Sequence, residues 1–250
     1  MTSQEGLILQ ATEKVLKELG VHDVTTLKSR FDEVLVAIDV ETYQVNLQDG
    51  TRTVSESVPE LPISPLSGPG PYSRDEVVRL VDSVADQLAN LFMHLRYLQR
   101  TKPRKTFERS IRELFRRLDY PFDESPVING KPDFLMPGKA LFKVNPAECI
   151  IFTAKRTLRE RWRQITTEGK NFRLFLATID ERVSENQLKE MLKQQVYLVI
   201  PKKKIDENAV YRGAKNVISF QEFFRDFLDP TAERWRRKGW VTPSEPTAKA

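Results

Sequence analysis

The sequence has very little cysteine and histidine. Cys149 is the single cysteine in 250 residues, which excludes an internal disulfide framework and a cysteine-based zinc site and fits a reducing compartment. The two histidines, His22 and His94, stand far apart, so a histidine-based metal site is not expected either. If a metal is used, it should therefore be a hard cation held by carboxylates.

Long apolar runs are also missing. No stretch approaches eighteen uncharged apolar residues, and the N-terminus lacks a basic region followed by an apolar one. We therefore expect neither a membrane span nor a signal peptide, and a cytoplasmic location. With 40% apolar and 30% charged residues, the chain should fold around a proper core rather than remain disordered.

The net charge of +5 is spread unevenly along the chain. Residues 96–117 include nine basic and two acidic side chains, and residues 155–173 include seven and two, so the remaining chain is net acidic. Basic clusters in an acidic background indicate a surface that binds a polyanion. Charge alone fits a pair of solvated helix faces equally well.

The first part of the chain reads as an accessory region that precedes the main domain. The pattern predicts a helix over 4–19, while 31–45 is ambiguous and 34–40 favours a strand. Five prolines and two glycines then interrupt regular structure over 58–72. We expect an accessory region at 1–72, a core at 73–230 and a polar tail at 231–250.

The core reads as an α/β fold, with a mixed sheet and helices packed on it. Ser73 and Glu76 form a capping box, which predicts a long helix to about residue 100 and a second one over 106–118. The expected strands are 127–128, 133–136, 148–154, 172–178 and 196–200, and the later helices are 157–167, 184–194 and 219–228. Sites in such folds gather where loops leave the strand ends.

Two charged residues mark neighbouring strand ends. Asp133 begins one strand, and Lys155 follows an apolar strand 22 residues later, which is a costly place for an ammonium group without a partner. Paired strands can bring both to one sheet edge, where the carboxylate can hold a divalent cation and the amine can orient or deprotonate a water. Alone, the pair also fits an exposed turn aspartate and an exposed lysine.

A metal site needs a second carboxylate. Position 153 is threonine and cannot supply it, so the candidates are Glu160, Glu168 and Glu108. Glu168 stands thirteen residues beyond Lys155 and can fold back toward the strand ends.

Long hydrogen-bond donors alternate with one acceptor directly after this lysine. Arginine pairs bidentately with guanine, and a carboxylate accepts from cytosine, so Arg159, Glu160 and Arg161 can read G·C pairs in the major groove. A salt-bridged surface helix is the alternative for this triplet.

Together these stretches resemble the type II restriction endonucleases of the EcoRII/PspGI group, which cut at CCNGG or CCWGG and belong to the PD-(D/E)XK superfamily. The stretches are 131–137 (KPDFLMP), 154–155 (AK), 159–164 (RERWRQ) and 184–191 (SENQLKEM). The resemblance implies a PD-(D/E)XK core with a central mixed β-sheet flanked by helices and an N-terminal helical or strand accessory region. It also implies Mg²⁺-dependent cleavage of double-stranded DNA by a homodimer in a prokaryotic cell.

The resemblance also implies roles for single residues. Asp133 and Glu168 would hold the metal, Lys155 would act on the water, and Glu108 would be an auxiliary acid. The 159–161 triplet would read the CC:GG pairs. We expect the DNA backbone to be contacted by Arg104, Lys105, Arg109, Arg156 and Arg163. Flipped central bases would stack on an aromatic side chain, for which Phe31, Tyr43 and Tyr72 are candidates.

Three further expectations complete the sequence-based interpretation. A cognate DNA methyltransferase is expected as a separate protein. A structure-selective repair or junction nuclease with the same core is one alternative function. A non-catalytic DNA-binding regulator that uses the same basic helices is the other.

Overall fold

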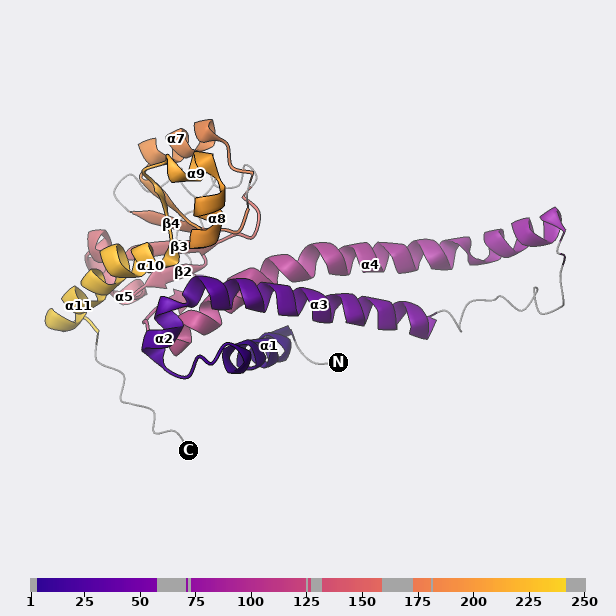
Figure 1. Ribbon diagram of the computed structural model, residues 1–250, viewed down its shortest axis with the longest axis horizontal. Helices are drawn as coiled ribbons and strands as arrows, with labels where there is room; N and C mark the ends of the chain where they lie inside the picture. Colours follow the sequence, from indigo (N-terminus) through magenta and orange to yellow (C-terminus); the bar gives the residue numbers. More distant parts are fainter. Residues whose placement is uncertain are drawn as a thin grey trace.

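Two long antiparallel helices extend from an end of the molecule that carries a mixed sheet (Figure 1). The computed structural model describes residues 4–57, 71, 73–124, 126, 132–158, 173–180 and 182–241. The N-terminal helices are α1 (Gln4–Glu18), α2 (Val24–Ser29) and α3 (Phe31–Ser57), and α4 (Arg74–Arg117) returns along α3 toward the sheet. The helix expected over 4–19 is thereby confirmed.

The strand expected over 34–40 is wrong, because this segment lies inside α3. Phe31, Val34, Leu35 and Ile38 are all fully buried. Their spacing of three, four and seven residues places them on one face of a helix, whereas a strand would point alternate residues to opposite sides. The apolar residues of this segment therefore follow the period of a helix and not that of a strand.

The two helices expected over 74–100 and 106–118 are one continuous helix, α4. Its start is confirmed, since Ser73 Oγ accepts from the Glu76 backbone N–H at 3.3 Å and Glu76 accepts from the Ser73 N–H at 2.8 Å. Pro103 lacks a backbone donor, yet a long helix can accommodate one proline with a local bend. Among the described residues, no helix is both long and apolar enough to cross a membrane.

Within the described part of the chain, the sheet contains six strands in the order in which they occur in the sequence. They are β1 (Asp123–Glu124), β2 (Phe134–Met136), β3 (Ile150–Ala154), β4 (Leu174–Ala177), β5 (Val196–Val199) and β6 (Val217–Ile218). The first three pair antiparallel, and β3 to β6 pair parallel. The parallel half places the chain segments that follow β3, β4 and β5 at one edge of the sheet.

Helices cover both faces of the parallel half. Phe175 and Ala177 of β4 belong to a core cluster with residues of α3 and α4, while Leu174 and Leu176 point to the other face. That second face is covered by α7 (Glu185–Lys193), α8 (Lys202–Glu207) and α9 (Ala209–Arg212). Burial on both faces is typical of parallel strands, and the expected α/β class with a central mixed sheet is confirmed.

The remaining elements are short or lie near the C-terminus. They are α5 (Lys139–Val144), a 3₁₀ turn (Pro146–Glu148), α10 (Phe220–Phe223), a π-helical turn (Phe224–Leu228) and α11 (Asp229–Arg237). The helix start expected at residue 219 is confirmed by the capping box of Ser219 and Glu222. The strand expected over 127–128 lies outside the described residues, as does most of the helix expected over 157–167.

Part of the segment expected to be a polar tail is helical. Helix α11 continues to Arg237, and Trp235 on it is 1% exposed. The indole N–H of Trp235 donates to the Glu148 carbonyl at 2.8 Å, which satisfies its one polar group inside the core. The overall polarity of residues 231–250 gave no indication that Ala232 and Trp235 are buried.

The N-terminal helices share their apolar core with the sheet. The Phe31 ring lies 6.0 Å from that of Phe115 in α4 and 4.8 Å from that of Phe220 in α10. Phe115 in turn contacts Phe152 of β3, with the ring centroids 5.1 Å apart. This aromatic cluster fixes α3 and α4 relative to the strands that end at the candidate site.

Asp32, next to Phe31, is a buried carboxylate at this junction. It accepts a hydrogen bond from the Lys202 backbone N–H at 2.8 Å, at the start of α8. Burial nevertheless raises its pKa to about 6, because losing water disfavours the charged form. The carboxyl group of Asp32 therefore binds its proton more tightly in the folded protein than in the unfolded chain.

We predict that Asp32→Asn flattens the dependence of stability on pH. The contribution of Asp32 is fully present below its unfolded pKa and is lost as pH rises through about 6. Urea unfolding at pH 4 and at pH 7 should show a fall that is about 2 kcal/mol larger in the wild type than in the variant, because pH 4 lies just above the unfolded pKa of this carboxyl. Equal falls in the two proteins would contradict the raised pKa.

Candidate active site

Asp133 and Lys155 meet at adjacent ends of two antiparallel strands. Asp133 directly precedes β2 and Lys155 directly follows β3, with Phe134 paired to Phe152 in the register. The Lys155 ammonium donates to both carboxylate oxygens of Asp133 at 2.8 Å. This ion pair gives the ammonium group of Lys155 a partner at the end of an apolar strand.

The backbone of β3 fixes the orientation of Asp133. The Ala154 N–H donates to Asp133 Oδ2 at 2.7 Å, and the Asp133 N–H donates to the Thr153 hydroxyl at 3.3 Å. Thr153 is fully buried. The threonine that cannot supply a metal ligand at this position therefore holds the neighbouring carboxylate in place, a role that the sequence did not reveal.

Glu108 of α4 brings a second carboxylate to this pair. Its Oε2 lies 4.0 Å from Lys155 Nζ, and the side chain is about two-thirds buried. The pKa of Glu108 is raised, first because the carboxyl is buried and then because Asp133 carries a negative charge beside it. The structure thus brings together three of the four residues expected to be catalytic.

The donor chemistry of this cluster fits a hard divalent cation. Two carboxylates share a partly buried position, and the repulsion between them would be relieved by a bound positive charge. Carboxylate oxygens are the ligands that Mg²⁺ prefers. Within the described ranges no group of three acidic, histidine or cysteine side chains gathers, and Glu168, which is expected to hold the metal together with Asp133, falls in the undescribed stretch 159–172.

Other expected site residues also fall outside the described part of the chain. These are Arg159, Glu160, Arg161 and Arg163, together with the side chain of Arg104. Lys105 is exposed, and Arg109 is half-buried, on the same helix as Glu108. The basic residues expected to contact DNA thus remain a prediction, except that Arg156 is engaged elsewhere.

Arg156 pairs with a carboxylate from the N-terminal helices. Its guanidinium donates to both oxygens of Asp39 in α3, at 3.1 and 2.9 Å. Asp39 precedes Arg156 by 117 residues, so no spacing in the sequence could have indicated the contact. The guanidinium is therefore occupied in the free protein, which counts against the expected role of Arg156 on the DNA backbone.

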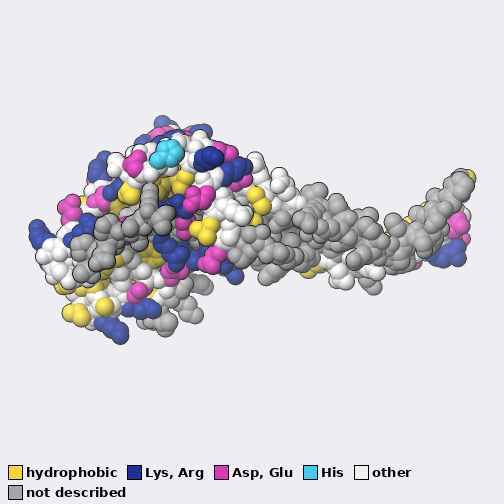
Figure 2. Space-filling view, turned by 90° about the horizontal axis from the view of Figure 1, so that it is seen from below, with side chains coloured by type: hydrophobic (Ala, Val, Ile, Leu, Met, Phe, Trp, Pro, Cys, Tyr) yellow, Lys and Arg dark blue, Asp and Glu magenta, His cyan; other side chains and the backbone are white. Residues whose placement is uncertain are grey.

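Much of the positive charge near the end of α4 is also neutralised locally. Arg112 pairs with Glu5 and Glu124, Arg116 with Glu124, and Arg117 with Glu13 and Glu113. Lys and Arg side chains accordingly alternate with Asp and Glu over the sheet-bearing end of the molecule in Figure 2. Part of the basic cluster at 96–117 is thus a salt-bridged helix face, which is close to the alternative of a solvated helix face that the charge pattern allowed.

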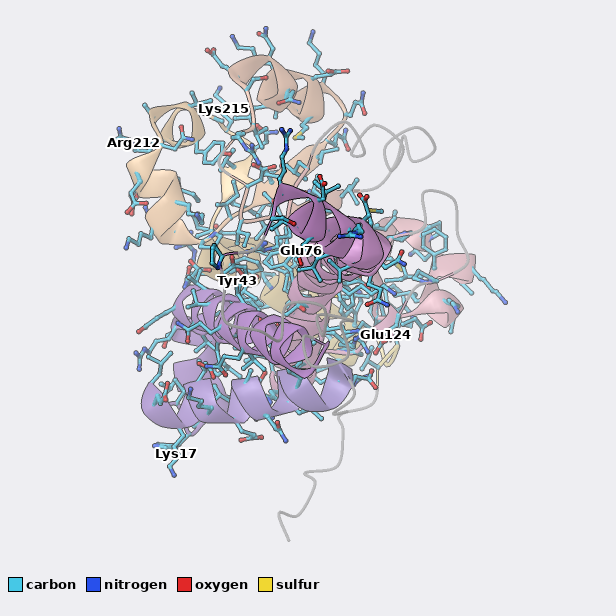
Figure 3. The ribbon with its side chains drawn as sticks, turned by 90° about the vertical axis from the view of Figure 1, so that its right-hand side faces the viewer. Lys17, Tyr43, Glu76, Glu124, Arg212 and Lys215 are labelled. Carbon is cyan, nitrogen blue, oxygen red and sulfur yellow. The ribbon has the colours of Figure 1, made fainter. Side chains whose placement is uncertain are left out.

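The aromatic candidates for base stacking differ in exposure. Phe31 is fully buried in the core, so it is not available to a ligand. Tyr43 is 49% exposed and projects from the upper side of α3 in Figure 3. Tyr72 lies outside the described residues.

Comparison with known families decides what kind of protein carries this cluster. The family model described as EcoRII C terminal matches residues 74–224, which is more than half of the chain. The chain belongs to the EcoRII C-terminal family. The resemblance to the EcoRII/PspGI group is thereby confirmed, and Glu108, Asp133 and Lys155 all lie within the matched residues.

One curated relative is similar in sequence to this EcoRII C-terminal chain over less than half of the chain's length. The type II restriction enzyme SsoII of Shigella sonnei is 24% identical over 112 residues, which covers 44% of this chain and 36% of SsoII. The match therefore spans about a third of that relative's own length.

Solved structures share the fold over most of the chain. Metal-depleted Ecl18kI, in complex with uncleaved, modified DNA, has a TM-score of 0.73 at 21% identity, covering 96% of this chain and 82% of that one. The restriction endonuclease PspGI in its substrate DNA complex has a TM-score of 0.62 at 15% identity, covering 90% and 93%. The PD-(D/E)XK fold expected from the sequence is therefore confirmed.

We predict that Thr153→Val destabilises this EcoRII C-terminal chain by about 1–2 kcal/mol. Valine keeps the volume of threonine but leaves the buried Asp133 N–H without an acceptor. The free energy of unfolding in urea measures the loss. A variant as stable as the wild type would show that this hydrogen bond does not form in solution.

Proposed function

We propose that the protein is a type II restriction endonuclease that makes a site-specific double-strand cut in DNA. The observation that carries the proposal is the convergence of Glu108, Asp133 and Lys155 at one strand edge in a chain of the EcoRII C-terminal family. By similarity to the EcoRII/PspGI group, the site is of the CCNGG or CCWGG type.

The side chains of the cluster would divide the work of phosphodiester hydrolysis. Asp133 and Glu168 would hold Mg²⁺, which supplies stabilisation of negative charge at the scissile phosphate. Lys155, held by Asp133 at 2.8 Å, would position the attacking water. The water oxygen bonds to phosphorus, the bond from phosphorus to the 3′ oxygen breaks, and the products carry a 5′-phosphate and a 3′-hydroxyl. Glu108 would assist as an auxiliary acid beside this lysine.

Recognition would use the segment that follows the lysine. Arg159, Glu160 and Arg161 would read the CC:GG pairs in the major groove through bidentate contacts. Lys105 and Arg109 of α4, with Arg104 and Arg163, would contact phosphates and add affinity without sequence preference. Arg156 is left out of these proposed phosphate contacts, because its guanidinium already pairs with Asp39.

Assembly and cellular context complete the proposal. A homodimer would match a near-palindromic site by its two-fold symmetry. Residues 1–72 would serve dimerisation or the handling of flipped central bases, for which Tyr43 is the described aromatic candidate with an exposed ring. The enzyme would act in the prokaryotic cytoplasm, beside a separate methyltransferase that protects the host DNA.

We predict that Asp133→Ala and Lys155→Ala lower the rate of DNA cleavage by at least about 100-fold and leave DNA binding intact. Each change removes a group at the reacting phosphate without removing contacts to bases. Digestion of a plasmid with Mg²⁺ measures cleavage, and a gel-shift assay measures binding.

Asp82→Ala is a matched control for these variants. Asp82 is exposed on α4 and stands 26 residues, about 40 Å, before Glu108. It should cut like the wild type, in discrete bands. Full cleavage by Asp133→Ala or Lys155→Ala would contradict the site, and a wild type that binds DNA but never cuts it would favour the non-catalytic regulator.

We predict that Arg159→Ala and Arg161→Ala each weaken binding to cognate DNA by about 10- to 100-fold, because each removes one bidentate base contact. Binding to unrelated DNA should persist. Arg212→Ala is the control, since Arg212 is exposed on α9 and points away from the body of the molecule in Figure 3. Unchanged cognate binding in both triplet variants would show that the triplet is a surface segment.

A further inference from the structure

Residues 155–158 join the candidate catalytic lysine to the segment that carries the Arg-Glu-Arg triplet. We call these four residues the connector. Its first residue extends the sheet, because the Lys155 N–H donates to the Ala177 carbonyl at 2.9 Å. Its last residue, Leu158, is 4% exposed in the core of the other sheet face. The connector is therefore anchored at both ends.

Side chains from the loop after β4 hold the connector on one side. The Thr178 hydroxyl donates to the Arg156 carbonyl at 3.2 Å, and Asp180 Oδ2 accepts from the Leu158 N–H at 3.0 Å. The Asp180 side chain is 10% exposed. These contacts fix the backbone from Arg156 to Leu158 relative to the parallel strands.

On the other side, the connector is held by a helix of the N-terminal region. Arg156 and Asp39 form a two-point ion pair, and the Asp39 side chain is only 13% exposed. Such a bidentate pair fixes orientation as well as distance. A partly buried pair is also screened less than a surface ion pair.

Helix α3 is a firm support for this contact. Ile38, next to Asp39, is fully buried in the core cluster that also contains Phe115 of α4 and Phe152 of β3. Helix α4 in turn carries Glu108. One packed unit therefore places Glu108 beside Lys155 and Asp39 beside Arg156.

We propose that Asp39 is a positioning residue for cleavage, which acts through Arg156 and sets the geometry of Lys155. The inference rests on the proposed nuclease function. It gives the N-terminal region a role at the candidate active site, and this role is separate from dimerisation and from the handling of flipped bases. The Asp180 contact lies between Arg156 and the triplet, so loosening at Arg156 affects Lys155 more than it affects base reading.

The competing possibility is that Arg156 serves DNA directly by contacting a phosphate. In that case Asp39 competes with DNA for the guanidinium, and Asp39→Ala would tighten DNA binding while Arg156→Ala would weaken it. A positioning role predicts instead that the two variants behave alike. The signs of the two effects on affinity therefore separate the possibilities.

The test compares Asp39→Ala, Arg156→Ala and the double variant with Glu41→Ala as the matched control. Glu41 also lies on α3 and pairs with Lys14 at 2.7 Å, but this pair does not touch the connector. Single-turnover cleavage of a cognate duplex with excess enzyme and Mg²⁺ reports the rate. Binding of the same duplex without divalent cation reports affinity, and thermal melting reports folding.

We expect both single variants to cut at least about ten times more slowly than the wild type, with cognate affinity within about threefold. The double variant should be no slower than the slower single variant, because both changes break one contact. Glu41→Ala should cut at the wild-type rate. If Asp39→Ala does not fold, Asp39→Asn replaces it, since an amide keeps the size but not the charge.

Amide hydrogen exchange gives a readout that does not depend on cutting. The amides of residues 155–158 should exchange faster in Asp39→Ala than in the wild type and remain unchanged in Glu41→Ala. Unchanged connector exchange, wild-type cleavage by Asp39→Ala, or opposite affinity changes in the two single variants would overturn the inference. A wild type that does not cut refutes the proposed nuclease, and connector exchange then still decides whether Asp39 holds this segment.

Discussion

The contact between Lys155 and Asp133 is the constraint on which the candidate site depends. An ammonium group at the end of an apolar strand needs a partner, and the antiparallel pairing of β2 with β3 supplies one at 2.8 Å. Two groups from β3, the Ala154 N–H and the Thr153 hydroxyl, then fix the same aspartate. Because the partners come from adjacent strand ends, the sheet itself sets their geometry, and α4 needs only to add Glu108.

The packing of the helices explains how the strand ends at the candidate site are held in position. An aromatic cluster that includes Phe31, Phe115 and Phe152 joins α3, α4 and β3 into one packed unit. Packed cores transmit displacements because they contain few voids. Glu108 and the Asp39–Arg156 pair therefore approach the strand edge from helices that cannot move independently of it. The N-terminal region is in this sense part of the support of the site.

The parts predictable from the sequence are those encoded by local pattern. Capping boxes at Ser73 and Ser219 fixed two helix starts, and an apolar strand that leads into Lys155 indicated the site. Glu108 was one of three candidate carboxylates, and the likeness to a known family gave it the role of an auxiliary acid. The strand expected over 34–40 was wrong because the apolar residues of this segment follow a helical period. Asp39 was missed because a contact across 117 residues leaves no local signal, and the role of the Thr153 hydroxyl depends on strand register.

Sequencing the ends of plasmid fragments after digestion with the wild-type protein and Mg²⁺ tests the central claim most directly. If the cluster of Glu108, Asp133 and Lys155 hydrolyses DNA at a recognised site, every fragment should begin with a 5′-phosphate at one short, near-palindromic sequence of the CCNGG or CCWGG type. Fragment ends scattered without regard to sequence, or an intact plasmid with and without Mg²⁺, would contradict it.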